Sequence, residues 1–246
     1  MVKPGDNLAE QIVGALGLNE VVLQDGDVVV VTSKIVSKAE GQVYDVTKLT
    51  VSERAEALSA LTGKESHFVE MVLRESTEVS RARQDVLLVR HRLGFVSANA
   101  GLDHSNLGHH NDDLVLLLPK DPDRSARDIR DHLEIDSGVR VAVVLSDTHG
   151  RPFRKGNIGV AIGVSGLTPL VIQRGEADLF GRVLLATDIP LADQLASAAG
   201  MVTGEAAEGW PVVVIRGARH VTGDGSAKDL IWPAHMDLYA APDKQY

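Results

Sequence analysis

An aspartate followed by three cationic side chains is the feature of this sequence most suited to chemistry. Asp147 comes soon after the hydrophobic run at residues 141–145, which is typical of a buried strand, and α/β sheets place ligands at the carboxyl ends of such strands. The cations, all within eight residues of the aspartate, are Arg151, Arg154 and Lys155. A carboxylate that can bind a divalent cation, beside arginines that can bind phosphate or carboxylate, predicts a phosphoryl-transfer site. The alternative is an aspartate that caps a turn next to solvated basic neighbours.

Two earlier segments carry groups suited to a nucleotide or a metal ion. Lys34 and Lys38 stand four residues apart near the hydroxyl of Ser33, and such groups can hold polyphosphate oxygens. This segment is not a P-loop, because the pattern Gly-x-x-x-x-Gly-Lys-Ser/Thr is absent. Further along, Asp103 offers a hard oxygen ligand and Asn106 an amide that can contact a base or a phosphate. The alternatives are a solvated strand end for the first segment and an ordinary turn for the second.

A loop after a predicted helix adds two more carboxylates. Gly204 is expected to end that helix, and Glu205 and Glu208 lie in the loop that follows, within residues 203–210. These glutamates are candidate metal ligands, and the alternative is a pair of solvated loop carboxylates.

The elements that must position these loops alternate between valine-rich apolar runs and helical patterns. Most of the apolar runs are hydrophobic throughout, so they are expected to be strands buried on both faces. The alternation predicts an α+β (mixed α/β) fold of two intertwined subdomains that share one active cleft. These subdomains are expected within a single domain over residues 1–246, with an internal boundary near 119–124. Helices are expected to begin at the N-caps Ser52, Ser125 and Asp188, and strands to lie at residues 27–31, 86–89, 114–118, 141–145, 170–173 and 212–215.

Composition argues against several classes of function. The 25 basic and 34 acidic residues give a formal net charge of −9, which disfavours binding to nucleic acids and to anionic membrane surfaces. The apolar runs are far shorter than the ~20 residues of a membrane-spanning helix, and no secretory signal is evident, so a cytoplasmic protein is expected. The absence of cysteine excludes disulfides, thiolate metal sites and cysteine nucleophiles. The sequence has neither the Gly-x-Ser-x-Gly elbow of hydrolases nor a dinucleotide-binding Gly-x-Gly-x-x-Gly at a strand-to-helix turn.

In their order along the chain, these loops resemble those of the coenzyme F420-0:L-glutamate ligase family, also called F420:gamma-glutamyl ligases. The resemblance covers nearly the whole chain and depends on the order and spacing of its motifs, none of which is decisive alone. The matching segments are residues 3–6, 29–38, 92–94, 101–106, 146–148, 150–152, 161–164, 191–196 and 204–205.

The resemblance implies an enzyme that joins the amine of L-glutamate to the carboxylate of coenzyme F420-0 or a related deazaflavin acid. It implies GTP as co-substrate, two divalent cations per site (Mn²⁺ or Mg²⁺), K⁺ as a candidate additional cation, and a homodimer. The residues that match metal ligands in the family are Asp103, Asp147, Thr148 and Glu205. Those that match nucleotide contacts are Ser33, Lys34, Lys38, Asn106, Thr203, Gly204, Glu205 and Gly209. The catalytic groups would be Asp147, Arg151 and Arg154.

The chemistry of such a reaction agrees with these residue types. A carboxylate is a poor electrophile and needs activation, most simply as an acyl phosphate, after which the amine displaces phosphate. Two cations that bridge the terminal phosphates would neutralise the developing charge, and they would allow an acidic protein to handle acidic substrates. Two alternatives use the same residues. One is a metal-dependent phosphohydrolase, phosphotransferase or ligase acting on a different acid and amine, and the other is a non-catalytic nucleotide-binding homologue.

The sequence departs from the family pattern at three places. The chain begins at residues 1–4 with Met-Val-Lys-Pro, so the first strand that is usual in the family is expected to be missing or shortened, which bears on the choice of base. Asn157 and Gly159 fall in a segment that commonly reads Gly-Gln-x-Asp, so a carboxylate is replaced by glycine. His104 and His149 stand where glycine and a bulky apolar residue are usual. These changes predict a different acid or amine, with Gly159→Asp expected to alter which substrate is accepted. The flavin-dependent reductase domain fused to some relatives is expected to be absent.

Overall fold

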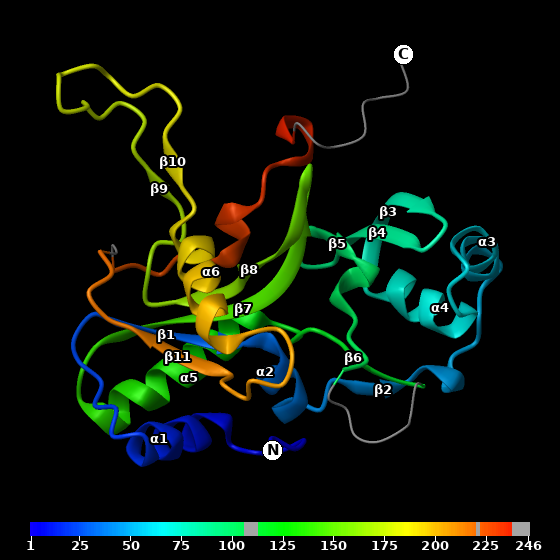
Figure 1. Cartoon of the computed structure of the whole chain (residues 1–246), viewed down its shortest axis with the longest axis horizontal. Helices are drawn as coiled ribbons and strands as arrows, with labels where there is room; N and C mark the ends of the chain where they lie inside the picture. Colours follow the sequence, from blue (N-terminus) through cyan, green and yellow to red (C-terminus); the bar gives the residue numbers. More distant parts are fainter. Residues whose placement is uncertain (106–112, 220–221, 238–246) are drawn as a thin grey trace.

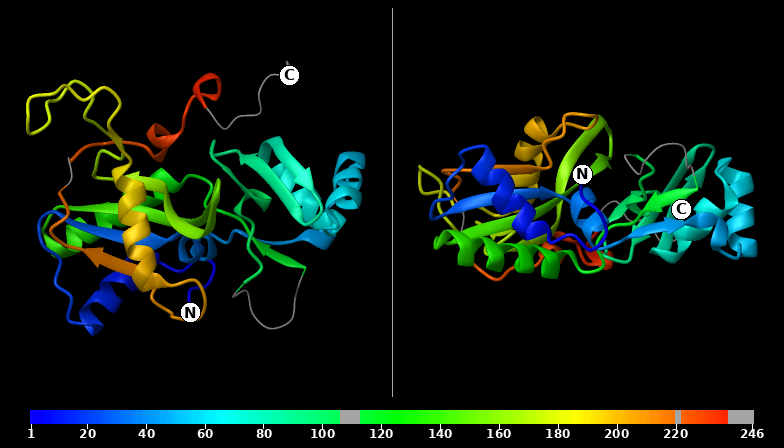
Figure 2. Two further views of the ribbon diagram at one scale, coloured as in Figure 1. Left: turned by 45° about the horizontal axis from the view of Figure 1, so that its top comes forward. Right: turned by 90° about the horizontal axis from the view of Figure 1, so that it is seen from below.

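The computed structural model describes residues 1–105, 113–219 and 222–237, and its main body is a four-stranded sheet with helices on both faces (Figure 1). A smaller unit, made of a three-stranded sheet and two helices, lies beside this body (Figures 1 and 2). The mixture of helices and sheets confirms the predicted α+β (mixed α/β) fold. None of the described helices combines the length and the hydrophobicity needed to cross a membrane.

The main sheet has the strand order β11-β1-β7-β8. Its two central strands, β1 (Asp27–Thr32) and β7 (Val141–Arg151), are parallel neighbours. β11 (Val212–Ile215) and β8 (Arg154–Ser165) add antiparallel edges. The valines at 28–31 are 0% exposed, which confirms the predicted strand buried on both faces.

Helices bury the two faces of this sheet in separate layers (Figure 2). α6 (Leu191–Thr203) packs on one face, where alanines let it approach closely. α5 (Pro122–Ser137) and α1 (Leu8–Leu18) cover the other face. α2 (Ser33–Ala39) follows β1 directly and packs into the same layer as α5.

The smaller unit has its own core. β3 (Ser76–Arg83), β4 (Val86–His91) and β5 (Val96–Ala98) form an antiparallel sheet that packs with α3 (Glu53–Thr62) and α4 (Ser66–Arg74). The remaining short elements are the paired strands β2 (Val43–Asp45) and β6 (Leu114–Leu116) and the 3-10 helices η1 (Val46–Lys48), η2 (Asn99–Gly101), η3 (Ala227–Leu230) and η4 (Ala234–Met236).

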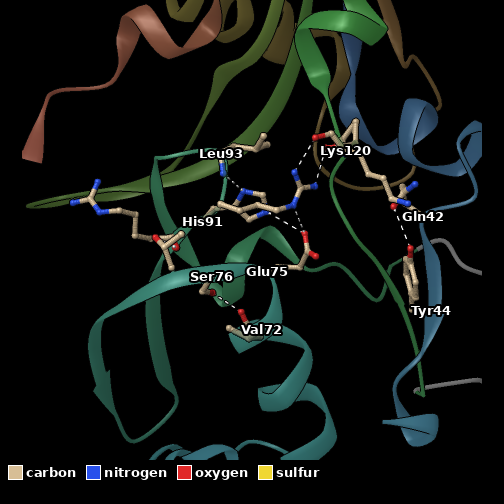
Figure 3. Close-up of polar contacts among 12 residues, drawn as sticks. Gln42, Tyr44, Val72, Glu75, Ser76, His91, Leu93 and Lys120 are labelled. Carbon is tan, nitrogen blue, oxygen red and sulfur yellow. Dashed lines mark hydrogen bonds and ion pairs between the residues drawn. The ribbon is translucent and has the colours of Figure 1, made fainter.

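Arg92 ties the smaller unit to the start of α5. Its Nε donates to Glu75 at 2.8 Å, while Nη1 and Nη2 donate to the backbone carbonyls of Lys120 and Pro119 at 2.8 and 3.1 Å. Figure 3 shows Glu75 and Lys120 joined through this contact. The expected internal boundary near 119–124 covers the end of the segment between β6 and α5, where the contact is made, and the first three residues of α5.

An arm extends away from the main body between β9 (Val171–Ile172) and β10 (Asp188–Ile189) (Figure 1). Asp178 orders its tip, because the carboxylate accepts two backbone N–H groups at 2.8 and 2.9 Å. At this tip Leu179 and Phe180 are 99% and 95% exposed. The arm therefore presents apolar side chains to solvent although its backbone is hydrogen-bonded.

Two of the three predicted helix starts are wrong. Ser52 does cap α3, but α5 begins one turn before Ser125. Its cap is Asp121, whose carboxylate accepts a first-turn N–H at 3.1 Å and precedes a proline that favours the first helical turn. Asp188 lies in β10, because its carboxylate pairs with Arg174 at 2.9 Å, and α6 begins three residues later.

Three other boundaries also differ from expectation. Residues 33–38, expected as a loop, form most of α2. The strand expected to end at 145 continues to Arg151, because β8 pairs with it as a hairpin. The run at 170–173 pairs only at 171–172 and is not buried, since Ile172 is 55% exposed. Strands are present at the other expected positions, 27–31, 86–89, 114–118 (where the strand ends at residue 116) and 212–215.

Gly159 in β8 is required because α6 crosses it at close range. A Cβ at this position would lie 2.5 Å from the backbone oxygen of Ala196 and 3.1 Å from Ser146 Oγ. Ser197 also donates a hydrogen bond to the Gly159 carbonyl at 2.7 Å. The structure thus gives Gly159 a packing role, because any side chain at this position would have to displace α6. The expectation that Gly159→Asp alters the choice of substrate stays a prediction.

We expect Gly159→Ala to lower the melting temperature, because overpacking of this kind costs about 1–3 kcal/mol. In a chain of this size each kcal/mol lowers the melting temperature by about 2–4 °C. Gly150→Ala is the matched control on the partner strand, since a Cβ there would meet nothing closer than 3.8 Å. Thermal unfolding followed by circular dichroism would measure both, and equal melting temperatures would contradict the packing argument.

Candidate functional site

The candidate site begins where the parallel pairing of β1 and β7 ends. The last pair is Thr32 with Ser146, and the chain continues to Ser33 on one side and to Asp147 on the other. Ser33 Oγ donates to Asp147 Oδ1 at 3.0 Å. Lys34 follows in α2, with its ammonium 2.7 Å from Asp103 Oδ2. Two neighbouring side chains of one short helix therefore contact two carboxylates that are 44 residues apart in the sequence.

A left-handed turn delivers Asp103 to this point. Asn99, Ala100 and Gly101 have consecutive φ values of +52°, +54° and +67°, a conformation that non-glycine residues seldom adopt and that often marks functional sites. The turn presses backbone against the site, because a Cβ at Gly101 would lie 3.0 Å from Leu118 Cδ1 and 3.6 Å from Asp147 Oδ2. The strained loop therefore allows a close approach that an extended chain would not make.

Charge is balanced locally around Asp103. Burial raises the pKa of Asp103, but the Lys34 ammonium and the N–H and hydroxyl of Ser105 lower it by more, so the net pKa is below its usual value. Lys34 also contacts Ser105 Oγ at 2.6 Å. One helical turn later, burial and the charge of Lys34 lower the pKa of Lys38. The two predicted phosphate-binding lysines thus share one face of α2, and one of them already neutralises a carboxylate.

The two histidines that depart from the family pattern have different surroundings. His149 lies on the same face of β7 as Asp147, with Nε2 3.0 Å from Asp147 Oδ2 and its ring 4.7 Å from Phe95. It is 9% exposed. His104 is exposed and stacks on Phe68 of α4 at 4.9 Å instead. Of the two histidines, His149 is the one that contacts Asp147.

The loop after α6 reaches the site through a threonine. Thr148 Oγ1 donates to Glu205 Oε1 at 3.2 Å. Gly204 ends α6 as predicted, with a φ of +64°, and a Cβ there would collide with the Glu208 carboxylate. This glycine turns residues 203–210, which include the predicted contacts Thr203 and Gly209, back toward β7.

Two predicted residues, Arg151 and Arg154, are not brought to Asp147. Arg151 lies four residues further along the extended β7, which at about 3.3 Å per residue places its backbone roughly 13 Å away. Arg154 follows the turn and is exposed on β8. Both arginines belong to a hairpin rather than to the loop expected after Asp147. Asn106 lies outside the described residues.

The donor set suits a hard divalent cation. Asp103, Asp147 and Glu205 offer carboxylate oxygens and Thr148 a hydroxyl, the ligand types that Mg²⁺ and Mn²⁺ prefer. Across residues 1–105, 113–219 and 222–237, no three histidine or acidic side chains already converge on one point. The chemistry of the donors fits a cation, and binding would require the carboxylates to turn from their present partners.

A cavity of about 380 Å³ opens beside this site, and it was not predicted. It follows the outer edge of β8, and His149 forms part of its wall. Lys120, Asp193 and Lys228 also line it. Asp193 lies within a segment that carried the resemblance, but nothing in its spacing assigned it a role. The two lysines are 108 residues apart, so no local motif could have linked them.

Comparison with known proteins decides the family. The model described as F420-0:Gamma-glutamyl ligase matches residues 1–217. The chain belongs to the F420-0:gamma-glutamyl ligase family. The match confirms the resemblance predicted from the loops.

Relatives of this F420-0:gamma-glutamyl ligase family member can be aligned with it over almost their full length. The coenzyme F420:L-glutamate ligase of Methanothermobacter thermautotrophicus is 44% identical over 97% of this chain and 94% of the relative. Proteins with the same description from Methanocaldococcus jannaschii and Methanopyrus kandleri are 43% and 44% identical, over 91% and 97% of this chain and 90% and 93% of theirs. All predicted site residues lie within the segment that the family model matches, whereas Lys228 lies beyond its end.

In this F420-0:gamma-glutamyl ligase family member, we expect Lys34→Met to raise the pKa of Asp103, because burial persists while the ammonium is lost. NMR titration of the carboxyl carbon in metal-free protein would measure the shift. Lys48→Met is the matched control, since Lys48 pairs with Asp45 at 3.2 Å but is 79% exposed, and a smaller change is expected there. An unchanged pKa of Asp103 would show that the ion pair does not control this carboxylate.

Proposed function

We propose that this chain is a GTP- and divalent-metal-dependent ligase that adds L-glutamate to the carboxylate of coenzyme F420-0 or a related deazaflavin acid. Family membership and the description of its relatives as coenzyme F420:L-glutamate ligases support the class of reaction. At the level of residues, the proposal depends on contacts that join four segments distant in the sequence. These contacts are Lys34–Asp103, Ser33–Asp147 and Thr148–Glu205.

The proposed reaction has two steps, and an acyl phosphate links them. A carboxylate oxygen of the deazaflavin acid attacks the γ-phosphorus of GTP, and GDP leaves. The amine nitrogen of L-glutamate then attacks the acyl carbon, inorganic phosphate leaves, and the nitrogen loses its proton to a base. The first step needs positive charge around the phosphates, and the second needs a separate place for the amino acid.

The chain supplies groups for the first step near the carboxyl end of β1 and the neighbouring part of β7. Asp103, Asp147, Thr148 and Glu205 would hold the cations, and a bound Mn²⁺ or Mg²⁺ would supply positive charge against the terminal phosphates. Lys34 and Lys38 add fixed charge on α2, and Ser33 orients Asp147. Three further parts of the proposal come from the resemblance to the family. They are two cations per site, GTP rather than ATP, and K⁺ as an additional cation. Arg151 and Arg154 would bind anionic groups of a substrate at the hairpin.

Mass spectrometry of the product tests this function. Incubation with the deazaflavin acid, L-glutamate, GTP and Mn²⁺ is expected to increase the mass of the acid by one glutamyl unit. Nucleotide turnover that does not depend on the amino acid would favour a phosphohydrolase instead. Nucleotide binding without any turnover would favour a non-catalytic homologue, although Gly159 no longer supports that alternative because helix packing explains it.

We expect Asp147→Asn to abolish the metal-dependent rise in melting temperature and to lower turnover by at least about 10–100-fold, the range seen for weaker changes around metals. The amide keeps an oxygen that can accept from Ser33, so melting without metal should change little. Asp136→Asn on the exposed face of α5 is the control and should behave as wild type. Normal turnover in Asp147→Asn would contradict a role for this carboxylate at the reacting phosphate.

The proposal includes a cytoplasmic homodimer, and the arm between β9 and β10 supports the dimer. Three apolar side chains of the arm lie outside the cores of the main body and of the smaller unit. Leu179, Phe180 and Leu185 are 99%, 95% and 81% exposed. Large apolar side chains exposed on an ordered hairpin are typical of a protein interface. A second copy of the chain would bury it, because most homo-oligomers form by symmetric pairing of identical surfaces.

We expect Phe180→Asp to convert the dimer to a monomer, because a charge at the tip of the arm would have to be desolvated in the interface. Light scattering during size-exclusion chromatography would give the mass. Ile135→Asp is the control, since Ile135 is also exposed, at 85%, but lies on α5. A dimer that persists in Phe180→Asp would exclude the tip of the arm from the interface.

A further inference from the structure

The cavity beside the site has the size of a pocket for a small metabolite. It measures about 380 Å³, and its walls come from β8, from η3 and from the starts of α5 and α6, among other segments. Protein pockets for ligands typically measure about 300–1,000 Å³, so this volume suits an amino acid better than a deazaflavin with its side arm. The hydrogen bonds of Arg92 to the backbone at residues 119 and 120 fix one wall of the cavity.

The cavity shares a wall with the carboxylate Asp147. His149 lines the cavity, and its Nε2 lies 3.0 Å from Asp147 Oδ2. Val160, directly opposite Asp147 on β8, lines it as well. A ligand in the cavity is therefore separated by a single side chain from the place where the acid would be activated.

Asp193 presents an acceptor to this cavity. Its Oδ1 accepts the backbone N–H of Ala161 at 2.9 Å, which satisfies the edge of β8, while Oδ2 has no hydrogen-bond partner among the described residues. Burial raises the pKa of Asp193, an effect that the Ala161 hydrogen bond and the nearby His149 only partly oppose. A half-buried carboxylate with one unused oxygen is suited to bind an ammonium group and accept its proton.

Two lysines supply the opposite charge. The other charged groups of the lining are already engaged: Arg92 makes three hydrogen bonds, Asp121 caps α5, and Asp123 accepts three hydrogen bonds. The ammonium groups of Lys120 and Lys228 form no hydrogen bond or ion pair within the part of the chain that the structure describes. The uncommitted charges are therefore one carboxylate and two ammonium groups, the complement of an amino acid with two carboxylates and one amine.

We propose that this cavity is the L-glutamate site of the ligase, with Asp193 binding the amine and Lys120 and Lys228 binding the two carboxylates. The inference rests on the proposed function and assigns its second step. The substrate ammonium transfers one proton to Asp193 Oδ2, and the free amine attacks the acyl carbon. As the amide bond forms, the carbon–oxygen bond to phosphate breaks, and the departing phosphate takes the second proton from the nitrogen. Asp193 then returns the first proton to water.

Hydroxylamine separates this inference from the proposed function, because it is a neutral nucleophile that can trap an acyl phosphate as a hydroxamate without an amino-acid site. Each enzyme would be assayed with the deazaflavin acid, GTP and Mn²⁺, once with L-glutamate and once with hydroxylamine. The variants are Lys120→Ala, Lys228→Ala and Asp193→Asn, with Lys48→Ala and Asp136→Asn as controls outside the cavity. In Asp193→Asn the amide oxygen can still accept from Ala161, so the strand edge keeps its cap.

We expect each lysine variant to raise KM for L-glutamate about 10–100-fold, the effect of losing one charged hydrogen bond, and Asp193→Asn to lower kcat with L-glutamate about 100-fold or more. Hydroxamate formation should stay near the wild-type rate in all three, and both controls should match wild type. An unchanged KM in both lysine variants overturns the inference. Parallel loss of hydroxamate formation also overturns it, because the cavity would then serve the acid or the nucleotide. Absence of hydroxamate with wild-type enzyme would instead contradict the proposed function itself.

Discussion

The parallel pairing of β1 with β7 is the constraint on which the rest of the structure depends. Both strands are buried between two helical layers, so a slip in their register would exchange the valines of the two layers and force both to repack. Beyond the last pair, β1 turns into α2 while β7 continues beside β8. Ser33 and Asp147 meet at this divergence, and the neighbours Lys34 and Thr148 extend the contacts to two further carboxylates. The site is thus a consequence of where two strands separate.

The outer edge of β8 shows how one set of groups can serve both stability and binding. Edge strands leave backbone N–H groups without partners, which favours unwanted pairing with other chains. Here Asp123 and Asp193 accept the N–H groups of Val164 and Ala161, so carboxylates from two helices complete the edge. Asp123 uses its other oxygen to hold Ser226, whereas Asp193 keeps its other oxygen toward the cavity. The same structural role therefore leaves one of the two carboxylates available for a ligand.

The sequence was informative at most places where short-range physics decides the structure, although it placed the start of α5 at Ser125 instead of at the local cap Asp121. The central strands are visible because uninterrupted valines need burial on both faces, and Ser52 and Gly204 act as helix boundaries through contacts within one turn. The prediction that Asp188 caps a helix was wrong because Arg174, 14 residues away, pairs with it in β10. The packing role of Gly159 could not be predicted, because the helix that needs a glycine there comes 37 residues later. The cavity escaped prediction for the same reason, since its charged groups come together only when the sheet, both flanking helices and the smaller unit are assembled.

The three hydrogen bonds of Arg92 also bear on how the molecule comes apart. The smaller unit and the main body have separate cores, and domains with separate cores can open or unfold independently. Arg92 and Lys120, which line the cavity, are joined across the boundary between them. A ligand that occupies the cavity touches both units and binds only when they are docked, so mass action favours the docked state. Occupancy would therefore merge two weakly coupled cores into a single cooperative unit of unfolding.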